Sequence, residues 1–98
     1  MISTHVLDTE RGEPASRVRV ELYRGDRLLS AQETDADGRI QELAPAALEP
    51  GRYRLVFFPG SSPFFTRIEV EVAIDDAGRS YHVPLLLSPY SCTTYRGS

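Results

Sequence analysis

Two histidines are the residues of this chain best suited to acid–base chemistry, and they lie far apart in the sequence. His5 and His82 are the only histidines among the 98 residues. A neutral imidazole can take a proton from water as a general base, because histidine titrates near neutral pH. An arginine beside it would stabilise the oxyanion that forms when this water attacks a carbonyl carbon. These residue types indicate hydrolysis; the alternative interpretation is two half-exposed residues on polar strand faces.

The C-terminal stretch Ser88–Ser98 is the second informative feature. It holds two tyrosines, a threonine pair and Pro89, which is typical of an ordered β-strand rather than of a frayed tail. The core-type residues end at Tyr95, so packing alone does not require the final Arg96–Ser98 triplet. We therefore expect the triplet to belong to a functional site, with Gly97 allowing a tight bend.

The elements that must position these residues are short strands. Val18, Val20 and Leu22 alternate with charged residues, which predicts one buried and one wet face. Clusters of turn residues separate this run from others like it. The predicted strands cover 18–22 and Ile2–Asp8, Leu28–Thr34, Arg52–Phe58, Ile68–Ile74, Ser80–Leu87 and Tyr90–Arg96, with a very short one near Ile40–Leu43.

This spacing predicts an all-β fold, a two-sheet antiparallel β-sandwich of seven to eight short strands. The length fits one compact unit, so residues 1–98 are expected to form a single domain. Pro84 lies inside the predicted strand Ser80–Leu87 and lacks a backbone N–H, so it should face an unpaired edge or a bulge. The tripeptide Arg24-Gly25-Asp26 is interpreted as a hairpin turn rather than as a recognition motif.

Charge and hydropathy argue against several classes of protein. A formal net charge of −3 and a pI near 5.3 do not suit nucleic-acid binding, which usually needs a basic surface. No apolar run approaches the roughly 20 residues of a membrane span, and the first residues do not resemble a secretory signal. Histidine and cysteine are too few for a tetrahedral zinc site, so no metal is expected.

Cysteine usage indicates the cellular compartment, and arginine usage indicates the type of genome. Cys92 is the only cysteine, which excludes an internal disulfide and fits a reducing cytoplasm. We expect its side chain to be a small buried packing group rather than a nucleophile. All basic residues are arginines and asparagine is absent, a bias that indicates a GC-rich bacterial genome.

Four segments of the chain together resemble one family. They are His5-Val6-Leu7-Asp8, Thr34-Asp35-Ala36-Asp37-Gly38-Arg39, Tyr81-His82-Val83-Pro84-Leu85-Leu86-Leu87-Ser88-Pro89 and the terminal Tyr95-Arg96-Gly97-Ser98. The chain is similar, nearly end to end, to the 5-hydroxyisourate hydrolases of the transthyretin-like family. This resemblance implies hydrolysis of 5-hydroxyisourate to 2-oxo-4-hydroxy-4-carboxy-5-ureidoimidazoline in urate catabolism, without a metal or an organic cofactor.

The resemblance also implies which residues surround one pocket. The expected catalytic residues are His5, Arg39, His82 and Ser98, and the expected substrate-binding residues are Tyr95, Arg96 and Gly97. A histidine would activate water and the arginines would stabilise the oxyanion, whereas Ser98 would act by positioning, through its hydroxyl or the terminal carboxylate. The sequence leaves open which histidine is the base.

The partners implied by the resemblance are the small-molecule substrate, 5-hydroxyisourate, and further copies of the chain. Family members assemble as a homotetramer, a dimer of dimers, with the active site in the channel between the dimers. Edge pairing in such an assembly would cover the open edges of a small sandwich. We expect neither nucleic acid nor a membrane as a partner.

Two features depart from the family pattern. Family members carry a short helix where this chain has only Phe58-Pro59-Gly60-Ser61-Ser62-Pro63, a loop too rich in proline and glycine for a helix. We therefore expect the family's short helix to be deleted. Ser91-Cys92 also replaces the usual Gly-Tyr on the terminal strand. The alternative function is a non-catalytic transthyretin-like protein that binds a small aromatic molecule in the same channel.

Overall fold

The computed structural model describes residues 1–97, and Ser98 lies outside the described residues. Within them the chain forms short strands joined by turns, and it contains no helix. It therefore contains no helix long and apolar enough to cross a membrane. In chain order the strands are β1 (Ile2–Asp8), β2 (Glu13–Pro14), β3 (Arg19–Arg24), β4 (Arg27–Glu33), β5 (Arg39–Ile40), β6 (Gly51–Phe58), β7 (Ile68–Ile74), β8 (Tyr81–His82), β9 (Leu85–Leu87) and β10 (Cys92–Thr94).

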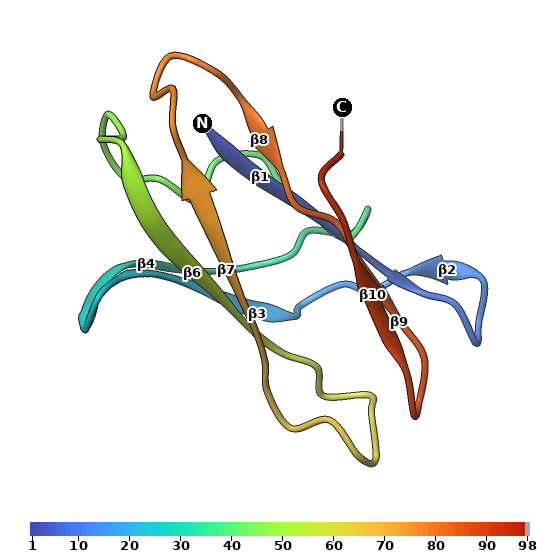
Figure 1. The fold of residues 1–98 in the computed structure, drawn as a ribbon. Helices are drawn as coiled ribbons and strands as arrows, with labels where there is room; N and C mark the ends of the chain where they lie inside the picture. The colour runs from blue at the N-terminus through green and yellow to red at the C-terminus, as the bar shows by residue number, and fades with distance from the viewer. Residues whose placement is uncertain (98) are drawn as a thin grey trace.

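The strands form two sheets, which confirms the predicted all-β sandwich (Figure 1). One sheet has the order β4-β3-β6-β7, and all its strand pairs are antiparallel. The other has the order β10-β9-β1-β2, with β5 and β8 also paired to β1. In this sheet β1 runs parallel to β8 and β9, so the sandwich is not wholly antiparallel as predicted. A parallel pair needs a long crossover connection. Here all strands of the β4-β3-β6-β7 sheet lie within the connection between β1 and β8.

Period-two alternation sets the core between the sheets. Ile2 and Val6 of β1, Val20 and Leu22 of β3, and Leu55 of β6 are fully buried, and each alternates with a more exposed residue. Burying these side chains is the main favourable contribution to folding in a chain of this size. The same alternation turns the intervening polar residues outward, and the candidate site is built on one of these outward faces.

The predicted strand Ser80–Leu87 is interrupted where Pro84 was expected to disturb it. The structure separates β8 from β9 at Val83 and Pro84, because proline cannot donate a hydrogen bond to the sheet. The register is the same on both sides of the break, with Ile2 opposite Tyr81 and Val6 opposite Leu85. The interruption therefore leaves His82 in line with β1.

Two predictions about the segments that connect strands are also confirmed. The segment between β6 and β7 contains no helix, as expected from its proline and glycine content. Instead Ser62 organises the loop: its Oγ accepts hydrogen bonds from the backbone N–H groups of Phe64 and Phe65 and donates to the carbonyl of Pro89. Gly25 lies in the hairpin between β3 and β4 with a positive φ of 58°, a conformation that glycine adopts readily.

Candidate active site

Strand β1 is the platform of the candidate site. Because Ile2, Thr4 and Val6 are buried in the core, Ser3 and His5 point to the opposite, outward face. The antiparallel pairing with β5 places Arg39 opposite His5. The parallel pairing with β8 places His82 opposite Ser3. Three of the residues predicted for the site thus lie together on one sheet face, although they come from distant parts of the sequence.

A tight turn before β5 holds Arg39 in place. One carboxylate oxygen of Asp35 accepts hydrogen bonds from the backbone N–H groups of Asp37 and Arg39, each 2.9 Å long. Gly38 closes the turn with a φ of 75°, and a Cβ at this position would collide with the carbonyl oxygen of Val6. Asp35 and Gly38 are therefore required by the geometry that brings Arg39 beside β1.

The same turn determines which nitrogen of the neutral His5 imidazole carries the proton. Its Nε2 lies 2.8 Å from the carbonyl oxygen of Asp37. A carbonyl oxygen only accepts hydrogen bonds, so Nε2 must carry a proton and donate it. The neutral form of His5 can therefore act as a base only through Nδ1.

His82 has the opposite arrangement. The side chain is half-buried, and its Nδ1 lies 2.9 Å from Oγ of Ser3, while no group among residues 1–97 is hydrogen-bonded to Nε2. Burial lowers the pKa of His82 below its ordinary value of 6.5, and the charges of Arg39 and His5 lower it further, against a smaller upward contribution from the Ser3 backbone. His82 is therefore neutral near pH 7 and has one free nitrogen.

A cavity of about 270 Å³ opens directly over this group of residues. It is lined by Ser3, Arg39, Ser80, His82 and Gly97. A second cavity of about 210 Å³ shares three of these residues and extends along the edge of β5. A small planar molecule in this space would touch a neutral imidazole and an exposed guanidinium, groups that can act as a general base and as an oxyanion stabiliser.

The C-terminal segment reaches the site through Gly97. Its backbone N–H donates a 2.8 Å hydrogen bond to the carbonyl oxygen of His82, which forms an isolated bridge between the two residues. A Cβ at Gly97 would lie 2.5 Å from Cδ2 of the His82 ring. Gly97 does not have a positive φ, and its close approach to the imidazole explains why a glycine is needed. The tight bend predicted here would turn Ser98, which lies outside the described residues.

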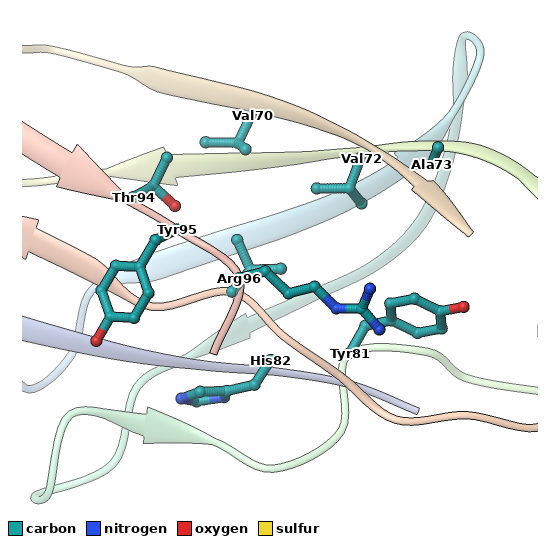
Figure 2. Close-up of a pocket in the computed structure, with 9 residues that line it drawn as sticks. Val70, Val72, Ala73, Tyr81, His82, Thr94, Tyr95 and Arg96 are labelled. Carbon is teal, nitrogen blue, oxygen red and sulfur yellow. The ribbon is translucent and has the colours of Figure 1, made fainter. Parts of the chain in front are cut away.

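Tyr95 and Arg96 lie on a different side of this segment. The Arg96 guanidinium stacks over the ring of Tyr81, 4.9 Å from its centre, and extends away from the His82 imidazole (Figure 2). Both residues line a third cavity, of about 340 Å³, together with His82 and with Val70 and Val72 of β7. The single chain therefore does not bring Arg96 together with Arg39, as the predicted site would require. Ser98, the remaining predicted residue, lies outside the described residues.

Two residues differ from what the sequence indicated. Ser3 was not among the predicted site residues, although its spacing of two from His5 places both on the same side of the strand. Cys92 was expected to be buried, but its side chain is exposed. It lies on β10, which among residues 1–97 pairs with β9 alone and forms an edge of its sheet. The apolar alternation needed to predict a buried position is missing from this strand.

Known structures with the same fold include a hydrolase and a transthyretin. A Klebsiella pneumoniae 5-hydroxyisourate hydrolase is 38% identical in sequence and superposes with a TM-score of 0.89, covering 99% of this chain and 92% of that one. Sea bream transthyretin in complex with thyroxine is 31% identical, with a TM-score of 0.85, and 98% of this chain and 93% of that one are covered.

Sequence relatives agree with this likeness. The 5-hydroxyisourate hydrolase of Salmonella typhi is 43% identical over 110 aligned positions, which include all of this chain and 81% of the relative. Because this chain has only 98 residues, at least 12 of these positions have no counterpart in it. The model of the HIUase/Transthyretin family matches residues 2–97. The chain belongs to the HIUase/Transthyretin family.

Proposed function

We propose that this chain hydrolyses 5-hydroxyisourate to 2-oxo-4-hydroxy-4-carboxy-5-ureidoimidazoline, a step of urate breakdown. One observation carries the proposal: a neutral imidazole with a free nitrogen, His82, lies beside the exposed guanidinium of Arg39 over one cavity. Among residues 1–97, no carboxylate forms an ion pair with Arg39, so its positive charge is available to a substrate. The names of the relatives support the same activity.

His82 is the better candidate for the general base. Its Nε2 is free among the described residues, and its lowered pKa keeps it unprotonated near pH 7. The Nε2 of His5 already donates to the Asp37 carbonyl, so His5 is better suited to binding a substrate oxygen or holding a second water through Nδ1. The geometry thus favours one histidine where the sequence left both open.

The reaction can be written with these groups. His82 takes one proton from water as the water oxygen bonds to a carbonyl carbon of the six-membered ring. The carbonyl electron pair moves to its oxygen, and Arg39 stabilises the resulting oxyanion. When the carbonyl re-forms, the ring C–N bond breaks and its electron pair goes to nitrogen. His82 then returns the proton to that nitrogen, leaving a carboxyl group and a ureido group.

The C-terminal tetrapeptide completes the proposed site. Gly97 packs against His82, and we assign Tyr95 and Arg96 to substrate binding and Ser98 to positioning through its hydroxyl or the terminal carboxylate. Arg96 stacks on Tyr81, away from Arg39, so it would reach substrate either by leaving that ring or in the site of a neighbouring copy.

A homotetramer built as a dimer of dimers is the proposed assembly. The outermost strands of the two sheets are available for pairing: β10 has three exposed residues, and β7 forms the edge of the other sheet. Sedimentation at assay concentration should give a tetramer. A fully active monomer would contradict this assembly, and a stable dimer would assign the loss of tetramer contacts to the deleted helix.

We place the protein in the cytoplasm of a bacterium, where its exposed Cys92 would stay reduced.

The activity is tested with freshly generated 5-hydroxyisourate, followed by its ultraviolet absorbance. The absorbance should fall faster when the protein is added, and NMR of the product should show the ring-opened carboxylate. The alternative is a carrier that binds a small aromatic molecule without turnover, as the sea bream transthyretin structure binds thyroxine. Decay at the rate of buffer alone, with saturable ligand binding, would favour this carrier.

A further inference from the structure

Ser3 makes a contact that the catalytic proposal does not explain. Its Oγ lies 2.9 Å from Nδ1 of His82, across the parallel pairing of β1 and β8. Among residues 1–97 this is the only hydrogen bond of the Ser3 side chain. The Ser3 backbone is used separately, because its carbonyl oxygen accepts the N–H of Val83 at 2.9 Å. The hydroxyl is therefore not needed to pair the strands.

The direction of this hydrogen bond decides what His82 can do. A serine hydroxyl can either donate or accept. If it donated to Nδ1, the neutral ring would carry its proton on Nε2, and the nitrogen facing the cavity could not take a proton from water. If it accepts from an Nδ1–H group, Nε2 keeps its lone pair.

We propose that Ser3 is a positioning residue that accepts a hydrogen bond from Nδ1–H of His82 and thereby keeps Nε2 as the basic nitrogen. This inference rests on the proposed function, in which His82 activates water. The second nitrogen of a catalytic imidazole commonly sets the tautomer in this way.

The other groups around His82 disfavour a proton on its ring, so a hydrogen-bond acceptor at Nδ1 is needed to stabilise the protonated form. The charged and titratable groups that act on its pKa are Arg39 on β5 and His5 on β1, and both disfavour a proton on the ring. Gly97 packs against the Cδ2 edge. Ser3 and Gly97 thus hold the imidazole from two sides. Among residues 1–97, only Ser3 offers a side-chain acceptor that stabilises the positive charge of the ring once Nε2 has taken a proton.

Kinetics of matched variants provide the first test. Ser3→Ala should lower kcat about tenfold, the usual size of a lost hydrogen bond to a charged group. Ser3→Thr keeps the hydroxyl and should restore most of this loss. Ser61→Ala is the control, because Ser61 is exposed in the loop between β6 and β7 and does not line the cavity over His82. It should leave kcat unchanged.

The pH profile shows which way the hydrogen bond points. If Ser3 accepts, it stabilises the protonated ring, so its removal should move the acidic limb of kcat/KM to lower pH. Movement of this limb to higher pH would show that Ser3 donates, and would overturn the proposal. An unchanged kcat and an unchanged limb in a folded Ser3→Ala protein would overturn it as well.

Nitrogen-15 NMR tests the tautomer without any substrate. The chain has only two histidines, so a His5→Gln variant assigns both rings. Neutral His82 should carry its proton on Nδ1, and Ser3→Ala should shift it towards a mixture of tautomers. A proton on Nε2 in the wild-type protein would contradict the proposal. If the protein fails to hydrolyse 5-hydroxyisourate but the tautomer depends on Ser3, the failure lies with the proposed function and not with the contact.

Discussion

The two sheets have outward faces that look alike in sequence and differ in charge compensation. On the β3–β6–β7 face, each of three arginines lies within 3.2 Å of a carboxylate: Arg19 at Glu21, and Arg54 and Arg67 at Glu69. On the β1–β5–β8 face, His5, Arg39 and His82 lie together, and no carboxylate among residues 1–97 pairs with them. One face is neutralised and the other keeps its positive charge.

The neutralised face is also bonded internally. The Tyr23 hydroxyl donates a 2.8 Å hydrogen bond to Glu21, which lowers the pKa of Glu21 and raises that of Tyr23. The Arg54 guanidinium stacks over the Tyr23 ring at 4.7 Å. Together with the ion pairs, these contacts hold Arg19, Arg54 and Arg67 against carboxylates of the same face. Such a surface contributes to stability and has little left to offer a ligand.

The comparison shows that alternation alone does not identify a functional face. Both sheets use period-two patterns to turn polar residues outward. What separates them is whether opposite charges are placed within reach across the strands. Uncompensated positive charge beside a half-buried histidine lowers stability slightly and prepares a site for a polar, partly anionic substrate.

The largest expected effect follows from removing the proposed base. His82→Ala should lower kcat/KM by about 10²-fold or more, as loss of a general base typically does. His5→Ala should follow the same trend, because His5 lies on the same face. The melting temperature should change little in either variant, since both side chains lie outside the core. Near-wild-type turnover in both folded variants would show that the β1–β5–β8 face is not the active site.

The C-terminus should have the next largest effect. Gly97→Ala places a methyl group against Cδ2 of His82, so we expect kcat/KM to fall about tenfold while circular dichroism stays unchanged. Deleting residues 96–98, or adding a C-terminal tag, should remove most activity. An N-terminal tag serves less well as a control because His5 lies near that end. Full activity in a C-terminally tagged protein would favour the carrier function.

Acidification should affect activity and stability at different pH. Because folding lowers the pKa of His82, kcat/KM should begin to fall only below pH 6.5, by about tenfold per pH unit once the ring is protonated. Stability from Glu21 and Asp75, whose pKa values are lowered by hydrogen bonds from tyrosines, should be complete above about pH 4.5 and lost as pH falls further. Parallel pH titrations of activity and unfolding would check this. Loss of both at the same pH would contradict the separation.

The smallest effect is expected on the neutralised face. Tyr23→Phe removes one hydrogen bond to Glu21 and should lower the free energy of unfolding by about 1 kcal/mol, measured by urea denaturation. Its kcat/KM should equal that of the wild-type protein. A clear fall in kcat/KM would show that the two faces are coupled, for example through the assembly.

The strands could be predicted well where one face is buried. Ile2–Asp8 and Ile68–Ile74 match the observed β1 and β7 to the residue, because burial of alternate side chains fixes both their length and their register. The tail was predicted as Tyr90–Arg96, but β10 covers only Cys92–Thr94, where all three residues are exposed. Without a buried face, the sequence contains no signal for the ends of this strand.

The site could be predicted only through the family resemblance. Its residues meet because β1 pairs in parallel with a strand almost eighty positions away, and no local pattern encodes that pairing. The role of Ser3 depends on a contact across this pair, which explains why sequence reasoning missed it. The stacking of Arg96 on Tyr81 was missed for the same reason.

Two arginines, one from each face, distinguish a charge used for catalysis from a charge used for stability. Arg39→Gln and Arg54→Gln make the same chemical change, and kcat/KM for 5-hydroxyisourate and the melting temperature are measured for both. Arg39→Gln should lower kcat/KM by about 10²-fold and leave the melting temperature nearly unchanged. Arg54→Gln should keep full activity and melt several degrees lower, at roughly 4–8 °C per kcal/mol lost. Equal activity in the two variants, or the reverse assignment of effects, would contradict the account.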